Sequence, residues 1–250
     1  MNFAAKNEIA TAVEVKTSPK ASTEEAFKAE ELILSGKVKV DGQVITELGT
    51  KVSDKNTVEV NNIKINREER VYYLLNKPRG VVTTTSDDKN RKTVIDLIDT
   101  NKRIYPIGRL DYDTTGVLIL TNDGEFANLI MHPKNEIDKV YVAKLKGIIN
   151  GEAVKKLLAG VSIDNDIVKA SRVKVRKTDS KTDSSMVEIT IHEGKNHQVK
   201  KMFESVGYLV DKLKRERIGF LTCGNLQSGE YRKLSNKEVS QLYVLANKTK

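Results

Sequence analysis

The chain has 250 residues, of which 38% are hydrophobic and 31% are charged, with a single cysteine and no tryptophan. This composition supports a real hydrophobic core, in one large domain or in a small and a medium one, and excludes a chain that is disordered throughout. No apolar run approaches the roughly 20 residues of a membrane helix, and the N-terminus lacks the apolar block of a signal peptide, so we expect a cytoplasmic protein. The lone Cys223 excludes a disulfide framework and a cysteine-based metal cluster.

The net charge of +9 is unevenly distributed along the chain. Residues 1–66 contain 9 Lys+Arg and 10 Asp+Glu, whereas residues 67–250 contain 34 and 24. The positive excess therefore belongs to the larger, C-terminal part. Such an excess favours a polyanionic partner, although surplus lysine that only aids solubility would give the same count.

The first predicted module covers residues 1–66. Residues 1–21 show no clear period and are expected to be irregular. Ser22 and Glu25 form a capping box for a helix that ends near Leu34. The stretches KVKVDGQVI and TVEVNNIKI then alternate apolar and polar residues around turn pairs, which predicts two hairpins.

The second predicted domain covers residues 67–250. Strands and helices alternate there without a regular βαβ rhythm, so we expect an α+β fold with a mixed, mainly antiparallel sheet flanked by helices. The predicted strands are 71–75, 81–84, 104–107, 117–121, 139–147, 186–194 and one just after 230, and the predicted helices are 93–98, 125–131, 151–160, 196–207 and 235–246.

A candidate reactive group lies in the stretch GRLDYDTTGVLILTNDG, where Arg109 and Asp111 precede a turn and an apolar strand. An aspartate before a turn often only caps the backbone. Asp111 and Asp113 also fit the haloacid-dehalogenase phosphatase pattern, in which a nucleophilic aspartate binds magnesium. That pattern requires an uninterrupted apolar strand before the first aspartate and an acidic pair further down the chain. Here Arg109 interrupts the strand, and the candidate pair lies upstream, so a single carboxylate held by cations is favoured.

Two segments carry clustered cations. In HEGKNHQVKKMFESVG the basic residues fall near the start of a predicted helix, against its dipole, which favours a nearby anion such as Asp111 or a phosphate. In DKLKRERIG the basic residues alternate with Leu213, which predicts a basic ribbon over an apolar face that could contact nucleic acid. Tyr141, between lysines in DKVYVAK, suits base stacking, although a strand tyrosine is as often part of the core.

These segments, in this order, resemble the RsuA/RluB family of pseudouridine synthases. The resembling stretches are LNKPRGVVTT, PIGRLDYDTTGVLILTNDG, HPKNEIDKVYVAKLKG, EGKNHQVKKMFESVGY and LKRERIGFLTCGNLQSGEYRKL, which together cover nearly all of residues 71–234. The resemblance implies isomerisation of a uridine to pseudouridine in ribosomal RNA, with the large subunit favoured and with no metal or cofactor. The target uridine must leave its stack to reach the reactive carboxylate.

The same resemblance implies roles for individual residues. Asp111 would be the catalytic aspartate, Tyr141 would stack on the target base, and Lys200 would be the basic partner of the aspartate, where many relatives carry arginine. Arg109 would position the loop or a phosphate, and Leu213 would pack in the same pocket. The residues expected to contact RNA are Lys77, Lys195, His197, Lys201, Lys214, Arg215 and Arg217.

Residues 28–65 resemble the second half of the ribosomal-protein-S-four-like (α-L) RNA-binding module. The first half is degenerate, and Ala26 and Phe27 stand where relatives have a basic pair. A monomer that acts on ribosomal RNA, away from any membrane, is expected. The alternative is a non-catalytic RNA-binding or ribosome-assembly factor on the same scaffold, against which the intact Asp111, Tyr141 and Lys200 argue.

Overall fold

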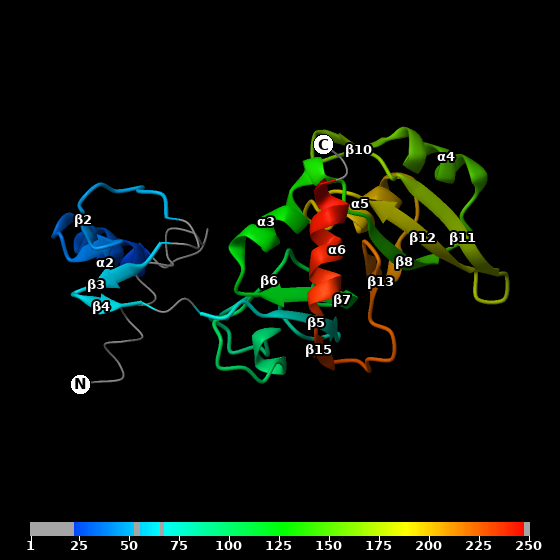
Figure 1. Cartoon of the computed structure of the whole chain (residues 1–250). Helices are drawn as coiled ribbons and strands as arrows, with labels where there is room; N and C mark the ends of the chain where they lie inside the picture. Colours follow the sequence, from blue (N-terminus) through cyan, green and yellow to red (C-terminus); the bar gives the residue numbers. More distant parts are fainter. Residues whose placement is uncertain (1–22, 53–55, 66–67, 248–250) are drawn as a thin grey trace. The chain divides into compact units, whose positions relative to one another are not determined.

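The computed structural model describes residues 23–52, 56–65 and 68–247. The chain divides into two compact units, residues 1–69 and 70–250, and each is described by itself (Figure 1). The expected irregular segment 1–21 and the side chains of Ala26 and Phe27 lie outside the part that the structure describes.

The small unit contains the predicted helix and both predicted hairpins. Helix α2 (Thr23–Leu34) precedes a four-stranded antiparallel sheet with the order β2-β1-β3-β4. Its strands are β1 (Val38–Val40), β2 (Gln43–Ile45), β3 (Val58–Val60) and β4 (Ile63–Lys64). Asp41 and Asn61 take left-handed backbone angles in the two turns, which these residue types tolerate well.

The large unit is built on a nine-stranded sheet with the path β11-β12-β8-β13-β7-β5-β15, to which β14 and β6 are attached. Only the pairing of β13 with β7 is parallel, so the sheet is mixed and mainly antiparallel, as predicted. Its strands are β5 (Tyr72–Lys77), β6 (Tyr105–Pro106), β7 (Thr115–Thr121), β8 (Lys139–Lys146), β11 (Arg172–Asp179), β12 (Ser184–Ile191), β13 (Val210–Ile218), β14 (Leu221–Thr222) and β15 (Tyr231–Lys233).

Hydrophobic cores cover both faces of the sheet around β7. Leu118 and Leu120 belong to a core that includes residues of α4 (Gly151–Ala159) and α5 (Gln198–Ser205). Val117 and Ile119 alternate with them and face α3 (Gly124–Met131) and α6 (Asn236–Asn247) on the other side (Figure 1). Burial on both faces explains why VLILT is continuously apolar instead of alternating.

Several elements differ from the sequence prediction. The hairpin β9 (Val161–Ile163) and β10 (Asp166–Val168), like β11, was not predicted, because these strands are short or carry mostly exposed polar residues. The strand expected at 81–84 is an irregular segment with one bridge, Val82 to Thr93. The helix expected at 93–98 is a single 3-10 turn, η1 (Ile95–Leu97), and a second, η2, spans Pro133–Asn135. No helix in the described part is long and apolar enough to cross a membrane.

Candidate active site

The loop that carries Asp111 joins β6 to β7 and is organised by a buried ammonium group. Lys77, at the end of β5, is fully buried, and its Nζ donates to the carbonyl oxygens of Pro78 at 3.0 Å, Asp111 at 3.1 Å and Thr114 at 3.1 Å. Burial lowers the pKa of Lys77 to about 8, against the opposite effect of Asp111 and Asp113. The expectation that Lys77 contacts RNA is therefore corrected, because all its donors are directed to backbone.

The segment after Lys77 fixes the same loop. Thr83 Oγ1 donates to the carbonyl of Leu110 at 2.6 Å, and the Gly80 amide donates to the carbonyl of Tyr112 at 2.9 Å. Arg79 Nε donates to the carbonyl of Asp113 at 3.1 Å. Within 81–84, Val82 pairs its backbone with residues 92–94, and only the Thr83 hydroxyl is directed to the loop, so this stretch forms one bridge and not a strand.

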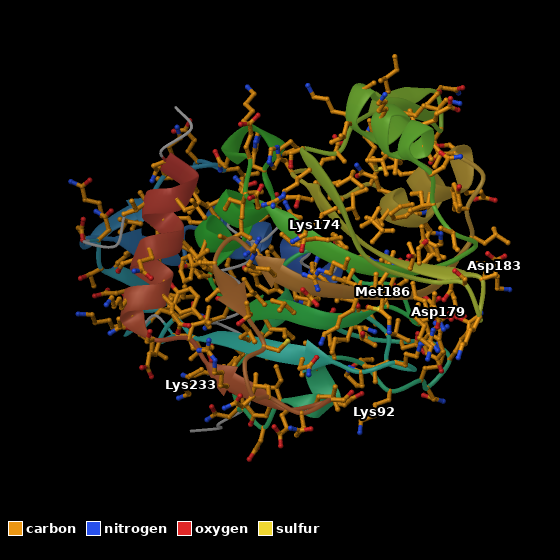
Figure 2. All side chains as sticks on the ribbon, turned by 90° about the vertical axis from the view of Figure 1, so that its right-hand side faces the viewer. Lys92, Lys174, Asp179, Asp183, Met186 and Lys233 are labelled. Atoms are coloured by element: carbon orange, nitrogen blue, oxygen red, sulfur yellow. The ribbon has the colours of Figure 1, made fainter. Side chains whose placement is uncertain are left out.

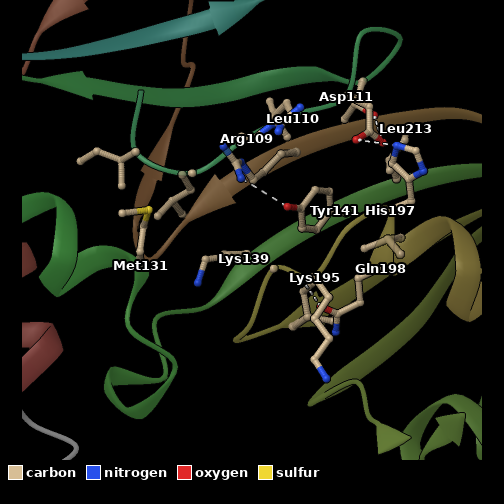
Figure 3. Close-up of a pocket in the computed structure, with 18 of the residues that line it drawn as sticks. Arg109, Leu110, Asp111, Met131, Lys139, Tyr141, Lys195, His197, Gln198 and Leu213 are labelled. Carbon is tan, nitrogen blue, oxygen red and sulfur yellow. Dashed lines mark hydrogen bonds and ion pairs between the residues drawn. The ribbon is translucent and has the colours of Figure 1, made fainter. Parts of the chain in front are cut away.

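The Asp111 carboxylate lies among groups from α5 and from its own loop, with 25% of its side chain exposed. Lys200 Nζ is 3.1 Å from Oδ2. His197 Nε2 is 3.4 Å from Oδ1, and Figure 3 shows this pair. Thr114 Oγ1 is 3.4 Å from Oδ2. The structure thus brings together the aspartate and the basic residues near the start of α5, which begins at Gln198, two residues later than predicted.

Lys200 is shared between two carboxylates. Its Nζ also lies 2.7 Å from Oδ1 of Asp113. Although burial acts to lower it, the pKa of Lys200 is raised by hydrogen bonds to Asp113 and Asp111, and the hydrogen bond from Lys200 lowers the pKa of Asp113. Lys200 therefore stays cationic and occupies the space between the aspartates, where the phosphatase pattern would bind magnesium. In the described part of the chain, no three His, Cys, Asp or Glu side chains are grouped to hold a metal ion.

A cleft of about 160 Å³ opens beside Asp111. Tyr141 from β8 and Leu213 from β13 line it together with Asp111, and Figure 3 shows all three facing the same space. The Tyr141 hydroxyl accepts a hydrogen bond from Arg215 Nη1 at 3.3 Å, and Arg215 Nε donates to the carbonyl of Val117 at 2.7 Å.

Arg215 was expected on an exposed basic ribbon, but it is only 3% exposed. The reason is strand alternation: Leu213 and Arg215 share the face toward the cleft, whereas Lys212 and Lys214 point to the other face and are exposed. Arg215 instead holds the Tyr141 ring, with Cζ 5.9 Å from the ring centroid. A β-bulge after Arg215 then interrupts the simple alternation, and Arg217 is half-buried.

A glycine allows β13 to lie against the start of β7. Gly116 has φ +106°, and a Cβ there would be 2.1 Å from the carbonyl oxygen of Arg215. Because no side chain fits between these backbones, the glycine after DYDTT permits the parallel pairing of β7 with β13.

The remaining predicted residues are more exposed. Arg109 lines the cleft and is exposed, as is the side chain of His197. Lys195 is paired with Asp166 at 2.6 Å, and Lys201 is paired with Asp164. These two pairs tie the start of α5 to the β9–β10 hairpin.

Lys139 is a cleft residue that the sequence reasoning missed. Its Nζ donates to the carbonyls of His192 at 2.5 Å and Ile137 at 3.3 Å. Burial, together with the nearby Arg215, lowers the pKa of Lys139 to about 8. The sequence did contain a signal for this position: Lys139 is two residues before Tyr141, so both side chains lie on the same face of the strand.

Residues 71–205 match the family described as RNA pseudouridylate synthase. The chain belongs to this family. An S4 domain matches residues 26–58. The synthase is 53% identical over 221 residues to the protein of Bacillus subtilis (strain 168) named ribosomal large subunit pseudouridine synthase B, covering 88% of this chain and 91% of that protein.

Other similar proteins agree with this assignment. An uncharacterized RNA pseudouridine synthase of Aquifex aeolicus (strain VF5) is 39% identical, over 86% of this chain and 87% of its own length. A crystal structure of a pseudouridylate synthase superposes with a TM-score of 0.63 at 30% identity, covering 86% of this chain and 93% of that chain. The synthase is thus an isomerase of uridine in RNA, as the motifs predicted.

Proposed function

We propose that this synthase isomerises a uridine of large-subunit ribosomal RNA, with Asp111 as its catalytic group and without a metal or cofactor. The observation that carries the proposal is that Asp111 is the one carboxylate among the described residues that line the cleft. The name of the Bacillus subtilis relative supports the choice of RNA. Because that RNA is cytoplasmic, the proposal implies a cytoplasmic protein, and we propose that it acts as a monomer.

The reaction breaks the bond between the ribose C1′ and N1 of uracil and forms a bond from C1′ to C5. The proton on C5 leaves and N1 gains one, so no electron acceptor is required. The cleft is adjacent to Asp111, and its aromatic and apolar lining suits a flipped-out base. We propose that the Tyr141 ring stacks on that base, that Arg215 fixes the ring, and that Leu213 packs against the base edge.

We propose that the groups around Asp111 direct its carboxylate toward the base. Lys200 and His197 contact the two carboxylate oxygens separately, so the group is held at both ends. We propose that Arg109 and His197, both exposed, bind phosphates near the target, with contributions from Lys195 and Lys201. Lys214 and Arg217 lie on the face away from the cleft, so any RNA contact they make is to another segment. In this proposal residues 67–250 form the catalytic domain, and residues 1–66 assist RNA binding.

The experiment is release of tritium from C5-labelled uridine in transcripts of the large and small ribosomal RNAs. Release from a single site of the large RNA is expected for the wild type and none for Asp111→Asn. Release only from the small RNA would overturn the choice of RNA, and full release by Asp111→Asn would overturn the role of the aspartate.

A further inference from the structure

The sheet of the large unit has one open region on the face that points away from the cleft. In β8 and β13, Tyr141 and Leu213 face the cleft, so their sequence neighbours face the opposite way. Helices α3 and α6 pack on β5, β7 and the end of β13, and α3 also reaches the rim of the cleft. Strands β11, β12, β8 and the first half of β13 continue this face, and Figure 2 labels Lys174 and Met186 on it. Met186 and the lysines of β11 and β13 are exposed there, whereas Val140, Val142 and Thr190 are buried. We call this part of the sheet the outer sheet face.

The strand register arranges the outer sheet face in three rows that cross four strands. Each row begins on β11 and ends on β13 with a basic residue, and the residues between these ends are neutral except for one glutamate, Glu188, and one lysine, Lys144. The rows are Arg172–Thr190–Val140–Arg217, Lys174–Glu188–Val142–Lys214 and Lys177–Met186–Lys144–Lys212. Since neighbouring strands are about 4.8 Å apart, the two edges of cations lie roughly 14 Å from each other.

Most of this positive charge is not neutralised within the protein. Arg176 takes up both glutamates of the face, Glu188 and Glu216, at 2.6 Å each. Lys144 has Asp211 at 3.9 Å. The ion pairs found in the described part of the chain do not include the other four lysines of the rows, which are Lys174, Lys177, Lys212 and Lys214.

The register also brings like charges together. Lys212 lies directly opposite Lys144 in the antiparallel pair of β13 and β8. Directly opposed like charges destabilise a sheet, and Asp211, at 3.9 Å from Lys144, offsets only part of this repulsion. A bound anion would remove this repulsion. The arrangement is therefore better explained by a polyanionic partner than by solubility alone, which does not require opposed lysines.

We propose that the outer sheet face binds the phosphate backbone of an RNA double helix, in a segment of the substrate other than the one in the cleft. The four strands present no aromatic side chain on this face, so the stacking platform that single strands use is missing. Two edges of cations on a flat surface instead match phosphates on either side of the wide, shallow minor groove of an RNA helix. The proposal rests on RNA being the substrate, but not on which RNA it is.

The test uses the full chain and an RNA duplex of about 20 base pairs, with binding measured at several salt concentrations. The variant is Lys174→Gln/Lys177→Gln/Lys212→Gln. The matched control, Lys155→Gln/Lys156→Gln/Lys169→Gln, removes the same charge from exposed lysines of α4 and of the segment after β10. The variant should lower the log–log salt slope of duplex binding by about 2 to 3 units, and the control should leave it near the wild-type value.

Equal slopes for the variant and the control would overturn the proposal. A single-stranded RNA of the same length should be affected less than the duplex, and an equal loss would overturn the choice of a double helix. If the triple variant loses binding of poly-glutamate but keeps binding of the duplex, the partner is an acidic protein and not RNA. Tritium release is measured separately, so a failure on ribosomal RNA would refute the proposed function while leaving this binding result intact.

Discussion

The Lys77 ammonium donates to the backbone carbonyl of Asp111, and not to its carboxylate, at 3.1 Å. Because the same group also holds the carbonyl of Thr114, it fixes the path of the loop on both sides of the turn. The carboxylate of Asp111 is left to Lys200 and His197. Backbone and side chain of one aspartate are thus positioned by different cations, which makes their effects separable by mutation.

Asp111→Asn should reduce isomerisation by roughly three or more orders of magnitude, because it removes the reactive charge while keeping the size of the side chain. RNA binding should change little. Asp113→Asn should retain substantial activity, since the removed carboxylate only competes for Lys200. Tritium release measures the activity, and filter binding measures the affinity for RNA. Excess chelator should leave the activity of the wild type unchanged. An inactive Asp113→Asn beside an active Asp111→Asn would contradict the assignment.

Lys200→Arg should retain most activity, because a cation remains beside Asp111. Lys200→Met should lose most of it, since Asp111 and Asp113 would then face each other without the cation that lies between them. The pH–rate profiles of both variants provide the measurement. A methionine variant as fast as the wild type would show that Lys200 has no part in the reaction.

Lys77 should make stability depend on pH. Its pKa is about 8 in the folded chain and about 10.4 when unfolded. Between these values the unfolded chain holds a proton that the folded chain has lost, so the contribution of Lys77 to the free energy of unfolding rises with pH. From pH 7 to pH 10, the free energy of unfolding of the wild type, measured in urea, should therefore rise relative to that of Lys77→Met by up to about 3 kcal/mol. A constant difference would refute the lowered pKa.

Gly116→Ala should destabilise the large unit by about 3 kcal/mol or more, since the added Cβ would collide with backbone and the left-handed angle would be strained. Activity should fall with it, because β13 carries Leu213 and Arg215 into the cleft. Gly151→Ala is the control: no atom lies within 4 Å of its added Cβ, so its stability should stay within about 1 kcal/mol of the wild type. Thermal unfolding measures the stability of both variants. Equal midpoints would contradict the close contact between Gly116 and the backbone of Arg215.

Deleting residues 1–66 should leave the salt slope of binding to a short ribosomal stem-loop nearly unchanged. The deleted part has 9 basic and 10 acidic residues, and each phosphate contact contributes about 0.7–0.9 to the slope. Affinity or site selection can still fall, because hydrogen bonds and shape contacts carry no such salt signature. A slope lower by two or more units would show that this part binds phosphate, despite Ala26 and Phe27.

The sequence alone determined the architecture and the reactive segment of this synthase. Local signals were sufficient for the helix and hairpins of the small unit, because a capping box and turn pairs act over a few residues. The continuous apolar run VLILT marked a strand buried on both faces. The segment around Asp111 was identified because its residue order is specific to the family.

Only the tertiary structure decided which cations remain available to a ligand. Lys77 and Arg215 lie in basic segments for which the sequence predicts exposure. In the structure, Lys77 is enclosed by backbone carbonyls, and Arg215 is buried where β13 packs against β7. The sequence shows how many cationic residues a segment has. Whether their side chains can contact a ligand depends on which face of the sheet each residue lies on and on what packs against that face. The rows of the outer sheet face were equally hidden, because residues of four strands meet through a register that no local pattern contains.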